Sequence, residues 1–337
     1  MTPLLARTAG RSTLIVAPNW LGDAVMALPF VRALRKARPA DSLTVVARRG
    51  PAAIFRAEGS ADGVWVAAGL FSDAVTLARG RVDEAWLLPN SFRSALLPFL
   101  ARVPERIGYA TDARAALLTH AVPRPAGTAH QLRDYDRLLA SRGVPTDMEP
   151  PRLPIPPNAA DRARRAIAAA GLPGGAPLVL LAPAASSGSI KKWPASRFAA
   201  LADSLAERGV LSGIVIGPGE ERLGEDVSRR ARHRPVVLGA DLDPVELGAL
   251  LRHARVVVSN DSGPMHLAAA VGTPVVAFFG PTDPGRTAPS GAPARVLDRY
   301  LFCSPCFLKR CPYGHECMEE ITPEMALAAV ESLMERT

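Results

Sequence analysis

Short apolar runs alternate with segments of helical spacing along almost the whole chain. Between the runs, apolar residues recur every three or four positions, as at Val25, Leu28 and Val31, which is typical of amphipathic helices. Strands that alternate with helices form parallel sheets covered by helices, so the pattern predicts an α/β protein. The runs that predict buried strands are 13–17, 43–47, 84–88, 178–182, 213–217, 255–258 and 273–279.

A proline-rich stretch at 148–157 divides this pattern into two halves of similar size. Prolines favour an extended, semi-rigid chain, so we expect a connector there. We predict a first domain over 1–150, a second over 151–321 and a final helix over 322–337. The two halves predict two doubly wound, Rossmann-like domains that face each other across a cleft.

Composition and charge narrow the class of partner. A hydrophobic content of 48% and a charged content of 21% are those of a soluble globular enzyme. The net charge of +8 favours anionic partners such as nucleotides, phosphorylated glycans or an acidic membrane surface. Nucleic acid is the weakest candidate, because only 5% of the residues are aromatic and no basic run is interleaved with them.

The membrane and targeting signals are weak. The longest apolar stretch, 267–280, is too short to span a bilayer and is broken by Gly272 and Pro274. We see no apolar signal core near the N-terminus, so we expect a cytoplasmic protein.

The segment 259–267 reads as strand, polar turn and helix. Asn260 to Gly263 are turn residues, and Pro264 suits the first turn of a helix. Free N–H groups and the positive end of the helix dipole would point into the space beyond the strand, which suits a phosphate or diphosphate. An ordinary strand–helix turn has the same pattern, and this segment alone does not separate the two interpretations.

Asp23 follows the strand at 13–17 and is expected at its carboxyl end. There it could act as a general base that takes a proton from an attacking hydroxyl. The alternative is an N-cap aspartate that holds the start of the next helix, and the residues alone favour that alternative.

The loop at 183–194 combines small hydroxyl residues with lysines. Two of the four lysines of the chain, Lys191 and Lys192, lie in it beside Ser186 and Ser187. This composition suits a phosphate-binding loop. A solvated loop with Trp193 packed as a lid is an equally weighted alternative.

A polar segment after the strand at 84–88 could bind an anionic acceptor. It contains Asn90, Ser91 and Arg93, with Arg106 downstream, and arginine matches phosphate and carboxylate geometry. Solvated surface arginines are the more common case, and the residues alone favour that interpretation.

All four cysteines, Cys303, Cys306, Cys311 and Cys317, lie within fifteen residues, with His315 between them. In a reducing compartment such clustering favours a metal over disulfides. The spacing is not a standard zinc pattern. We therefore expect reduced thiols in a structured loop, and a zinc or iron–sulfur site is the alternative.

Five motifs in order give the chain its resemblance to a known family. They are PNWLGDAVM (18–26), NSFRSAL (90–96), KKWP (191–194), NDSGPMH (260–266) and GPTDP (280–284). Together they resemble the family 9 glycosyltransferases, and within them the heptosyltransferases of type II. Nearly the whole chain is covered by the resemblance.

The resemblance implies a GT-B fold in which the second domain binds ADP-heptose and the first binds the acceptor, an anionic lipopolysaccharide inner core. The final helix would pack back on the first domain. Asp23 stands where the family has its catalytic base. The donor-binding positions implied are Ser186, Ser187, Lys191, Glu220, Asp261, Ser262, Gly263 and His266, and the acceptor-binding ones are Asn90, Ser91, Arg93 and Arg106.

The implied reaction is an inverting sugar transfer that requires no cofactor, apart from a possible structural metal at the cysteines. Peripheral contact with the cytoplasmic face of the inner membrane would fit the basic charge. The chain departs from related enzymes at Ser186, where they often carry glutamate, and Glu220 and Glu221 compete as donor ribose ligand. The alternatives are another sugar-nucleotide enzyme, such as a different glycosyltransferase or an epimerase, and a non-catalytic nucleotide-binding protein.

Overall fold

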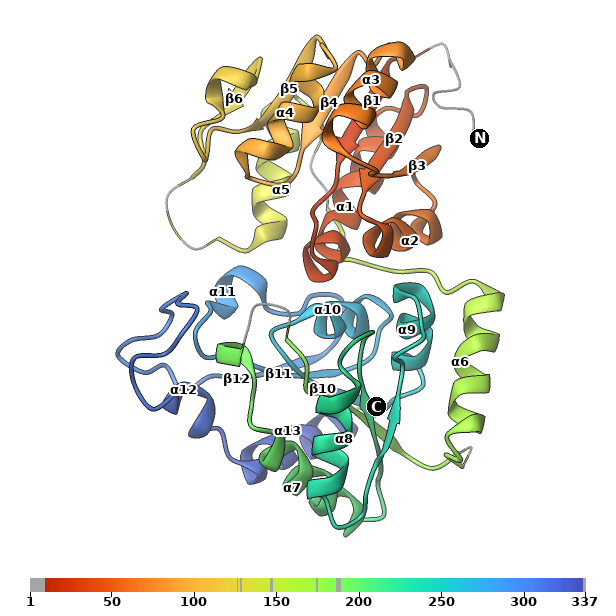
Figure 1. Ribbon diagram of the computed structural model, residues 1–337, viewed down its shortest axis with the longest axis vertical. Helices are drawn as coiled ribbons and strands as arrows, with labels where there is room; N and C mark the ends of the chain where they lie inside the picture. The colour runs from red at the N-terminus through yellow and green to blue at the C-terminus, as the bar shows by residue number, and fades with distance from the viewer. Residues whose placement is uncertain are drawn as a thin grey trace. The chain divides into compact units, whose positions relative to one another are not determined.

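The computed structural model describes residues 10–125, 127, 129–145, 148–173, 175–185 and 189–335. The chain divides into two compact units, Met1–Pro151 and Arg152–Thr337, and the division falls inside the proline-rich connector. Figure 1 shows one parallel sheet with its covering helices in each unit.

The first domain is a parallel sheet of six strands in the order β3-β2-β1-β4-β5-β6. Its strands are β1 (Ser12–Val16), β2 (Ser42–Ala47), β3 (Gly63–Val66), β4 (Glu84–Leu87), β5 (Glu105–Tyr109) and β6 (His120–Val122). Its helices are α1 (Leu21–Ala37), α2 (Arg49–Glu58), α3 (Leu70–Gly80), α4 (Phe92–Leu100), α5 (Gln131–Ala140) and the short 3₁₀ helix η1 (Ala115–Leu117). Helices α1, α2 and α5 cover one face, and α3 and α4 cover the other (Figure 1).

The strand order of the first sheet reverses between β1 and β4. The chain runs outward from β1 to β3, crosses the sheet through α3, and runs outward again from β4 to β6. The loops after β1 and β4 therefore diverge to opposite faces of the sheet. In open parallel sheets the ligand crevice lies outside the carboxyl ends of the strands at such a switch point.

The second domain repeats this design with six parallel strands in the order β12-β11-β10-β7-β8-β9. Its strands are β7 (Leu178–Ala182), β8 (Leu211–Val215), β9 (Val236–Leu238), β10 (Val256–Asn260), β11 (Val275–Phe278) and β12 (Ala294–Leu297). Its helices are α6 (Pro157–Ala169), η2 (Ser189–Lys191), α7 (Ala195–Ala206), α8 (Glu221–Arg230), α9 (Pro244–Leu251), α10 (Gly263–Ala270), α11 (Pro284–Thr287), α12 (Glu316–Glu319) and α13 (Pro323–Met334). The switch point lies between β7 and β10.

Both sheets confirm the predicted doubly wound α/β class, and the reason lies in strand burial. All residues of β2, β4, β7, β10 and β11 are buried. Strands buried on both faces are the continuous apolar runs that a parallel sheet between two helix layers requires. Under α7, the rings of Trp193, Phe198 and Phe278 pack together with centroids 4.4 to 5.8 Å apart.

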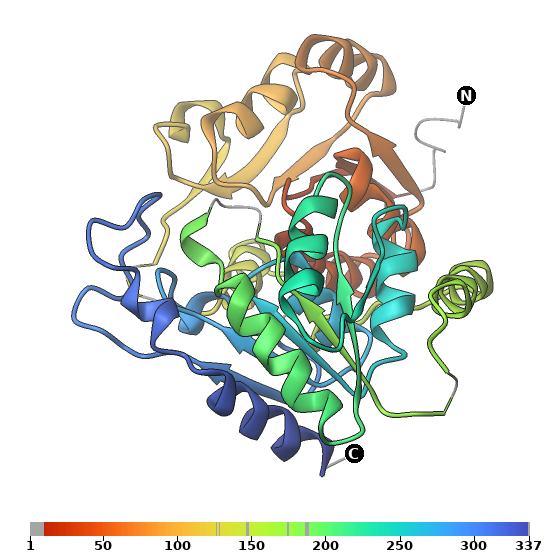
Figure 2. The same ribbon diagram turned by 60° about the horizontal axis from the view of Figure 1, so that its bottom comes forward.

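The C-terminal helix α13 lies in the second unit, and its predicted packing against the first domain stays a prediction. Within its own unit it packs on α7 and on strands β10 to β12 (Figure 2). Its apolar stripe of Ala326, Val330 and Leu333 is buried in the core that Trp193 shares. Because this stripe completes the helix layer over the second sheet, α13 belongs to the second domain.

No helix in the described part of the chain is both long and apolar enough to cross a bilayer.

Candidate functional site

One buried asparagine fixes the loop after β7 at the switch point of the second sheet. Asn260, the last residue of β10, accepts a hydrogen bond from the Trp193 amide at 2.9 Å and donates one to the Pro183 carbonyl at 2.8 Å. Its side chain is fully buried. The two bonds hold Pro183 and Trp193, and Lys191 precedes Trp193 by two residues.

Lys191 pairs with an aspartate that follows β10, and a threonine that follows β11 donates to the same carboxylate. Its Nζ lies 2.6 Å from Oδ2 of Asp261, and the Thr282 hydroxyl donates to the same oxygen at 2.8 Å. The loops after β7, β10 and β11 therefore converge on one carboxylate. An ammonium group has three donors, and the pair with Asp261 uses one of them, so Lys191 keeps donors for an anion. We call these three residues the Lys191 cluster.

Beside the Lys191 cluster, helix α10 starts from Ser262, within the residues predicted as the turn before the helix. Ser262 is the N-cap residue and Gly263 the first helical residue, with Pro264 in the first turn. The first N–H groups of a helix lack intrahelical acceptors and carry the positive end of its dipole. Ser262 is buried, with its Oγ 3.2 Å from Oγ of Ser259, and His266 is buried one turn later. A helix N-terminus therefore lies beside Lys191, which is the arrangement that the phosphate interpretation of this segment requires.

The two glutamates predicted near the donor ribose follow β8, the strand next to β7. Glu220 accepts from the Gly217 amide at 2.7 Å, and Glu221 accepts from the Gly219 amide at 3.1 Å. Backbone N–H donors lower the pKa of Glu221. Glu220 is the less exposed of the two, and only one of its oxygens is engaged in that bond. The predicted Ser186 and Ser187 lie outside the described residues.

In the first domain, Asp23 lies in the first turn of α1, just beyond the carboxyl end of β1. The N-cap residue is Trp20, which makes no side-chain capping bond, so Asp23 is not the cap that the residues alone favoured. Asp23 is partly exposed, and Trp20 is 57% exposed. The carboxylate therefore stands at the switch point of the first sheet, inside the first turn of α1 rather than at its N-cap.

Three predicted acceptor residues follow β4, the strand on the other side of that switch point. Ser91 caps α4 by accepting from the Ser94 amide at 3.3 Å, and Arg93 is exposed in the first turn. Oδ1 of Asn90 is buried and has no hydrogen-bond partner in the described part of the chain. Asn90, Ser91 and Arg93 thus share the carboxyl edge of the sheet with Asp23.

Arg106 does not join them. It is the second residue of β5, so it lies at the amino end of that strand. Its guanidinium donates to the carbonyls of Leu117 at 2.7 Å and Val103 at 2.5 Å, and it lies over the Phe99 ring. These contacts tie strand β5 to its flanking loops at the amino edge of the sheet.

Sequence reasoning missed Arg114, which is fully buried in the turn after β5. It donates to the Tyr109 carbonyl at 2.9 Å, to the Ser94 hydroxyl at 2.9 Å and to the Pro89 carbonyl. Burial lowers the pKa of Arg114 to about 10, which keeps it charged at neutral pH. Arg114 therefore locks the loop of Asn90 and Ser91 against the turn after β5.

Two exposed arginines, Arg48 and Arg49, were also missed, although they directly follow a predicted strand. They stand at the carboxyl end of β2, next to β1. The chain uses arginine almost everywhere, so composition could not single them out.

Comparison with known proteins agrees with this geometry. The model of the family described as "Glycosyltransferase family 9 (heptosyltransferase)" matches residues 74–316, which is more than half of the chain. This chain belongs to glycosyltransferase family 9. The resemblance seen in the motifs is thereby confirmed.

Relatives of this family 9 chain include the lipooligosaccharide heptosyltransferase 2 of Campylobacter jejuni, 30% identical over 47% of this chain and 51% of the relative. The chain spans about half the length of the curated relatives that it matches. The solved structure of E. coli ADP-heptose lps heptosyltransferase II covers 96% of this chain and 99% of its own, with a TM-score of 0.81 and 23% identity. E. coli heptosyltransferase WaaC with ADP-2-deoxy-2-fluoro heptose matches with a TM-score of 0.69 and 19% identity, over 95% and 99%. These structures confirm the predicted fold class.

The four cysteines of this family 9 chain are free thiols, and Cys317 is buried. Burial first, and then the three other thiols, raise the pKa of Cys317 to about 11. In the described part of the chain, no group of three or more His, Cys, Asp or Glu side chains is placed to hold a metal.

Proposed function

We propose that the protein transfers L-glycero-D-manno-heptose from ADP-heptose to the lipopolysaccharide inner core with inversion at the anomeric carbon. The observation that carries the proposal is the Lys191 cluster beside the start of α10, at the switch point of the second sheet. Membership of family 9 supports the reaction class. The WaaC structure with ADP-2-deoxy-2-fluoro heptose supports an ADP-linked heptose as donor, because that analogue accompanies a related fold.

The donor diphosphate would bind between Lys191 and the N–H groups of Ser262 and Gly263. Both elements are preorganised, since Asn260 holds the Trp193 amide close to Lys191 and the N–H groups of Ser262 and Gly263 belong to the start of α10. Fixed donors aimed at developing negative charge stabilise a departing diphosphate without reorganisation. His266 and Glu220 complete the proposed donor contacts, with Glu220 toward the ribose.

Asp23 would act as the general base. The acceptor hydroxyl oxygen forms a bond to the anomeric carbon on the face opposite the diphosphate, and the bond from that carbon to the diphosphate oxygen breaks. The hydroxyl proton passes to Asp23, and ADP leaves as the anion. The first turn of α1 holds this carboxylate just beyond the carboxyl end of β1, where it would accept the proton.

The acceptor would bind at the carboxyl edge of the first sheet. Asn90, Ser91 and Arg93 follow β4, and the exposed Arg48 and Arg49 follow β2, so cationic side chains flank Asp23 along one edge. Guanidinium groups match the carboxylates and phosphates of an anionic core oligosaccharide. The net charge of +8 supports the same acceptor, and it supports peripheral contact with the anionic cytoplasmic face of the inner membrane.

The experiment combines purified protein with ADP-heptose and heptosyl-Kdo2-lipid A, and measures ADP release and acceptor mass. We expect one added heptose, dependent on both substrates. Asp23→Asn should lower kcat by about 100-fold or more, with ADP affinity unchanged. Glu324→Gln is the matched control, since it removes an exposed first-turn carboxylate of α13 outside the site.

The outcomes separate the alternatives. Turnover of Asp23→Asn close to that of the parent would remove Asp23 from the chemistry. Transfer to Kdo2-lipid A in place of the heptosylated acceptor would assign type I specificity rather than type II. A changed sugar without any acceptor would indicate an epimerase, and ADP binding without any reaction would indicate a non-catalytic protein.

The predicted structural metal at the four cysteines remains a prediction, and metal analysis of the purified protein tests it. A stoichiometric metal that is lost in Cys311→Ser would support the prediction. Metal-free protein with four titratable thiols would contradict it.

A further inference from the structure

The segment between β12 and α12 carries an unusual number of exposed apolar side chains. Of the eleven large apolar side chains that are exposed in the described structure, five lie in this one segment. They are Tyr300, Phe302, Phe307, Leu308 and Tyr313, with exposed fractions of 75%, 85%, 63%, 47% and 54%. Scattered exposed apolar residues are normal, but a contiguous group marks an interaction surface.

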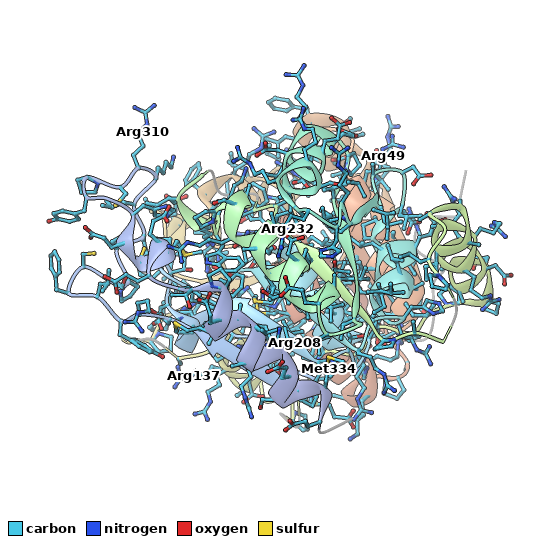
Figure 3. All side chains as sticks on the ribbon, turned by 90° about the horizontal axis from the view of Figure 1, so that it is seen from below. Arg49, Arg137, Arg208, Arg232, Arg310 and Met334 are labelled. Carbon is cyan, nitrogen blue, oxygen red and sulfur yellow. The ribbon has the colours of Figure 1, made fainter. Side chains whose placement is uncertain are left out.

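Residues 299–313 of this segment, which follow Asp298, carry only cationic charges. Residues 299–313 contain Arg299, Lys309 and Arg310 and no aspartate or glutamate. Arg299 pairs with Glu320 at 3.3 Å, whereas Lys309 and Arg310 are exposed and form no ion pair with any described residue. Figure 3 shows Arg310 extending away from the ribbon into solvent. We call residues 299–313 the aromatic–basic loop.

The aromatic–basic loop is held in place from within and from its base. The rings of Phe302 and Tyr313 pack edge to face with centroids 5.5 Å apart, and the Phe307 amide donates to the Pro281 carbonyl at 2.8 Å. Beyond the carboxyl end of the loop, Met318 is buried and packs closely on Gly280. A Cβ added to Gly280 would lie only 2.7 Å from Sδ of Met318. The exposed rings are therefore displayed by a fixed loop, while the half-buried Cys303, Cys306 and Cys311 are less exposed than the rings between them.

We propose that the aromatic–basic loop anchors the protein to an anionic lipid surface. Tyrosine and phenylalanine rings partition into the interfacial layer of a bilayer, and lysine and arginine beside them attract anionic head groups. The absence of any carboxylate in residues 299–313 makes the loop complementary to a surface of one charge sign. The proposal rests on the proposed function, because that function places the acceptor in such a surface.

The anchor is connected to the donor side of the second domain. His315, just after the loop, forms a hydrogen bond with the Ile190 carbonyl, next to Lys191. Pro281, which accepts from the Phe307 amide, precedes Thr282 of the Lys191 cluster. Lipid contact at the loop would therefore be made close to the carboxyl edge of the second sheet, where the donor is proposed to bind.

The test measures sedimentation of the full chain with vesicles of phosphatidylethanolamine, with and without phosphatidylglycerol. We expect the parent to bind the anionic vesicles and to be released by salt. Phe302→Ser combined with Phe307→Ser, and separately Lys309→Glu combined with Arg310→Glu, should each weaken binding by about tenfold or more. All four side chains are exposed, so thermal unfolding should be unchanged.

Matched controls make the same chemical changes elsewhere. Phe71→Ser removes a ring that is 76% exposed on α3, and Arg79→Glu combined with Arg229→Glu reverses two charges outside the loop. These variants should bind vesicles like the parent. Loss of binding that is equal in the loop variants and the controls would overturn the proposal, as would loop variants that bind like the parent.

Transfer to a deacylated, water-soluble acceptor separates this proposal from the proposed function. Loop variants should retain parental turnover on that acceptor while losing vesicle binding. If the parent transfers no sugar to any acceptor, the proposed function fails, whatever the vesicles show. A third outcome is a parent that is oligomeric and does not bind vesicles, with loop variants that are monomeric. In that case the loop binds a second copy of the chain, and the lipid proposal is wrong.

Discussion

Replacement of Asn260 by alanine tests how the donor-side loop is positioned. The side chain is fully buried and holds the Trp193 amide at 2.9 Å and the Pro183 carbonyl at 2.8 Å. Alanine removes both hydrogen bonds and leaves a buried donor and a buried acceptor unpaired. Each unpaired group costs roughly 1–3 kcal/mol, so we expect the free energy of unfolding to fall by about 3 kcal/mol.

The same change should reach the donor site, because Lys191 lies two residues before Trp193. With the loop released, the position of its ammonium group is no longer fixed, and we expect ADP affinity to fall about tenfold. Urea unfolding measures the first effect and calorimetric titration with ADP measures the second. Asn158→Ala, an exposed change in the first turn of α6, is the control and should alter stability by less than about 0.5 kcal/mol.

The reasoning is refuted if Asn260→Ala loses less than about 1 kcal/mol and binds ADP like the parent. That result would mean that the loop after β7 is held by contacts other than this amide. Loss of stability with unchanged ADP affinity would separate the two roles and would remove Asn260 from the positioning of Lys191.

Three further variants test the contacts of Lys191, Arg114 and Glu105. Lys191→Ala should weaken ADP binding by about tenfold or more while the fold is retained, and an unchanged Kd would remove Lys191 from the phosphate site. Arg114→Met should lower the free energy of unfolding by about 2–4 kcal/mol in urea, because four backbone and side-chain acceptors lose their buried donor; a change below about 0.5 kcal/mol would contradict that role. The hydrogen bond from Arg11 lowers the pKa of Glu105 in the folded protein. The ion pair therefore stabilises the fold at pH values above the pKa of Glu105 in the unfolded chain, and this stabilisation is lost as pH falls through the lowered pKa of the folded state. Glu105→Gln should therefore destabilise at neutral pH and have little effect at about pH 3, and equal effects at both would be inconsistent with this ion pair.

Local patterns along the chain were sufficient to predict the main helices and strands and the positions of some candidate site residues. Apolar runs and helical spacing predict β7, β10 and α1 because burial on two faces and an amphipathic period are properties of neighbouring residues. Asp23 and Asp261 could be placed at carboxyl ends for the same reason, since each follows a predicted strand within a few residues. The order strand, turn, helix can be read from neighbouring residues. That order also places the turn at the carboxyl end of its strand.

Arg106 and Arg114 show where local patterns are insufficient. Both arginines follow the Asn90 segment and look alike in the sequence, yet Arg106 lies at the amino end of β5 and Arg114 is buried beyond its carboxyl end. Which end of a strand a residue occupies depends on the strand boundaries and on the register with β4, and both are set by pairing between distant segments.

The sequence by itself determined the alternation of strands and helices, the two-domain organisation and the motifs of family 9. Only the tertiary structure decided that β7 lies beside β10, so that Lys191 meets Asp261 seventy residues away. It also decided that α13 covers the second sheet and that the rings of residues 299–313 stay exposed. The physical reason is that propensity and hydrophobic period act over a few residues, whereas strand order and burial depend on which apolar faces pack together across the whole domain.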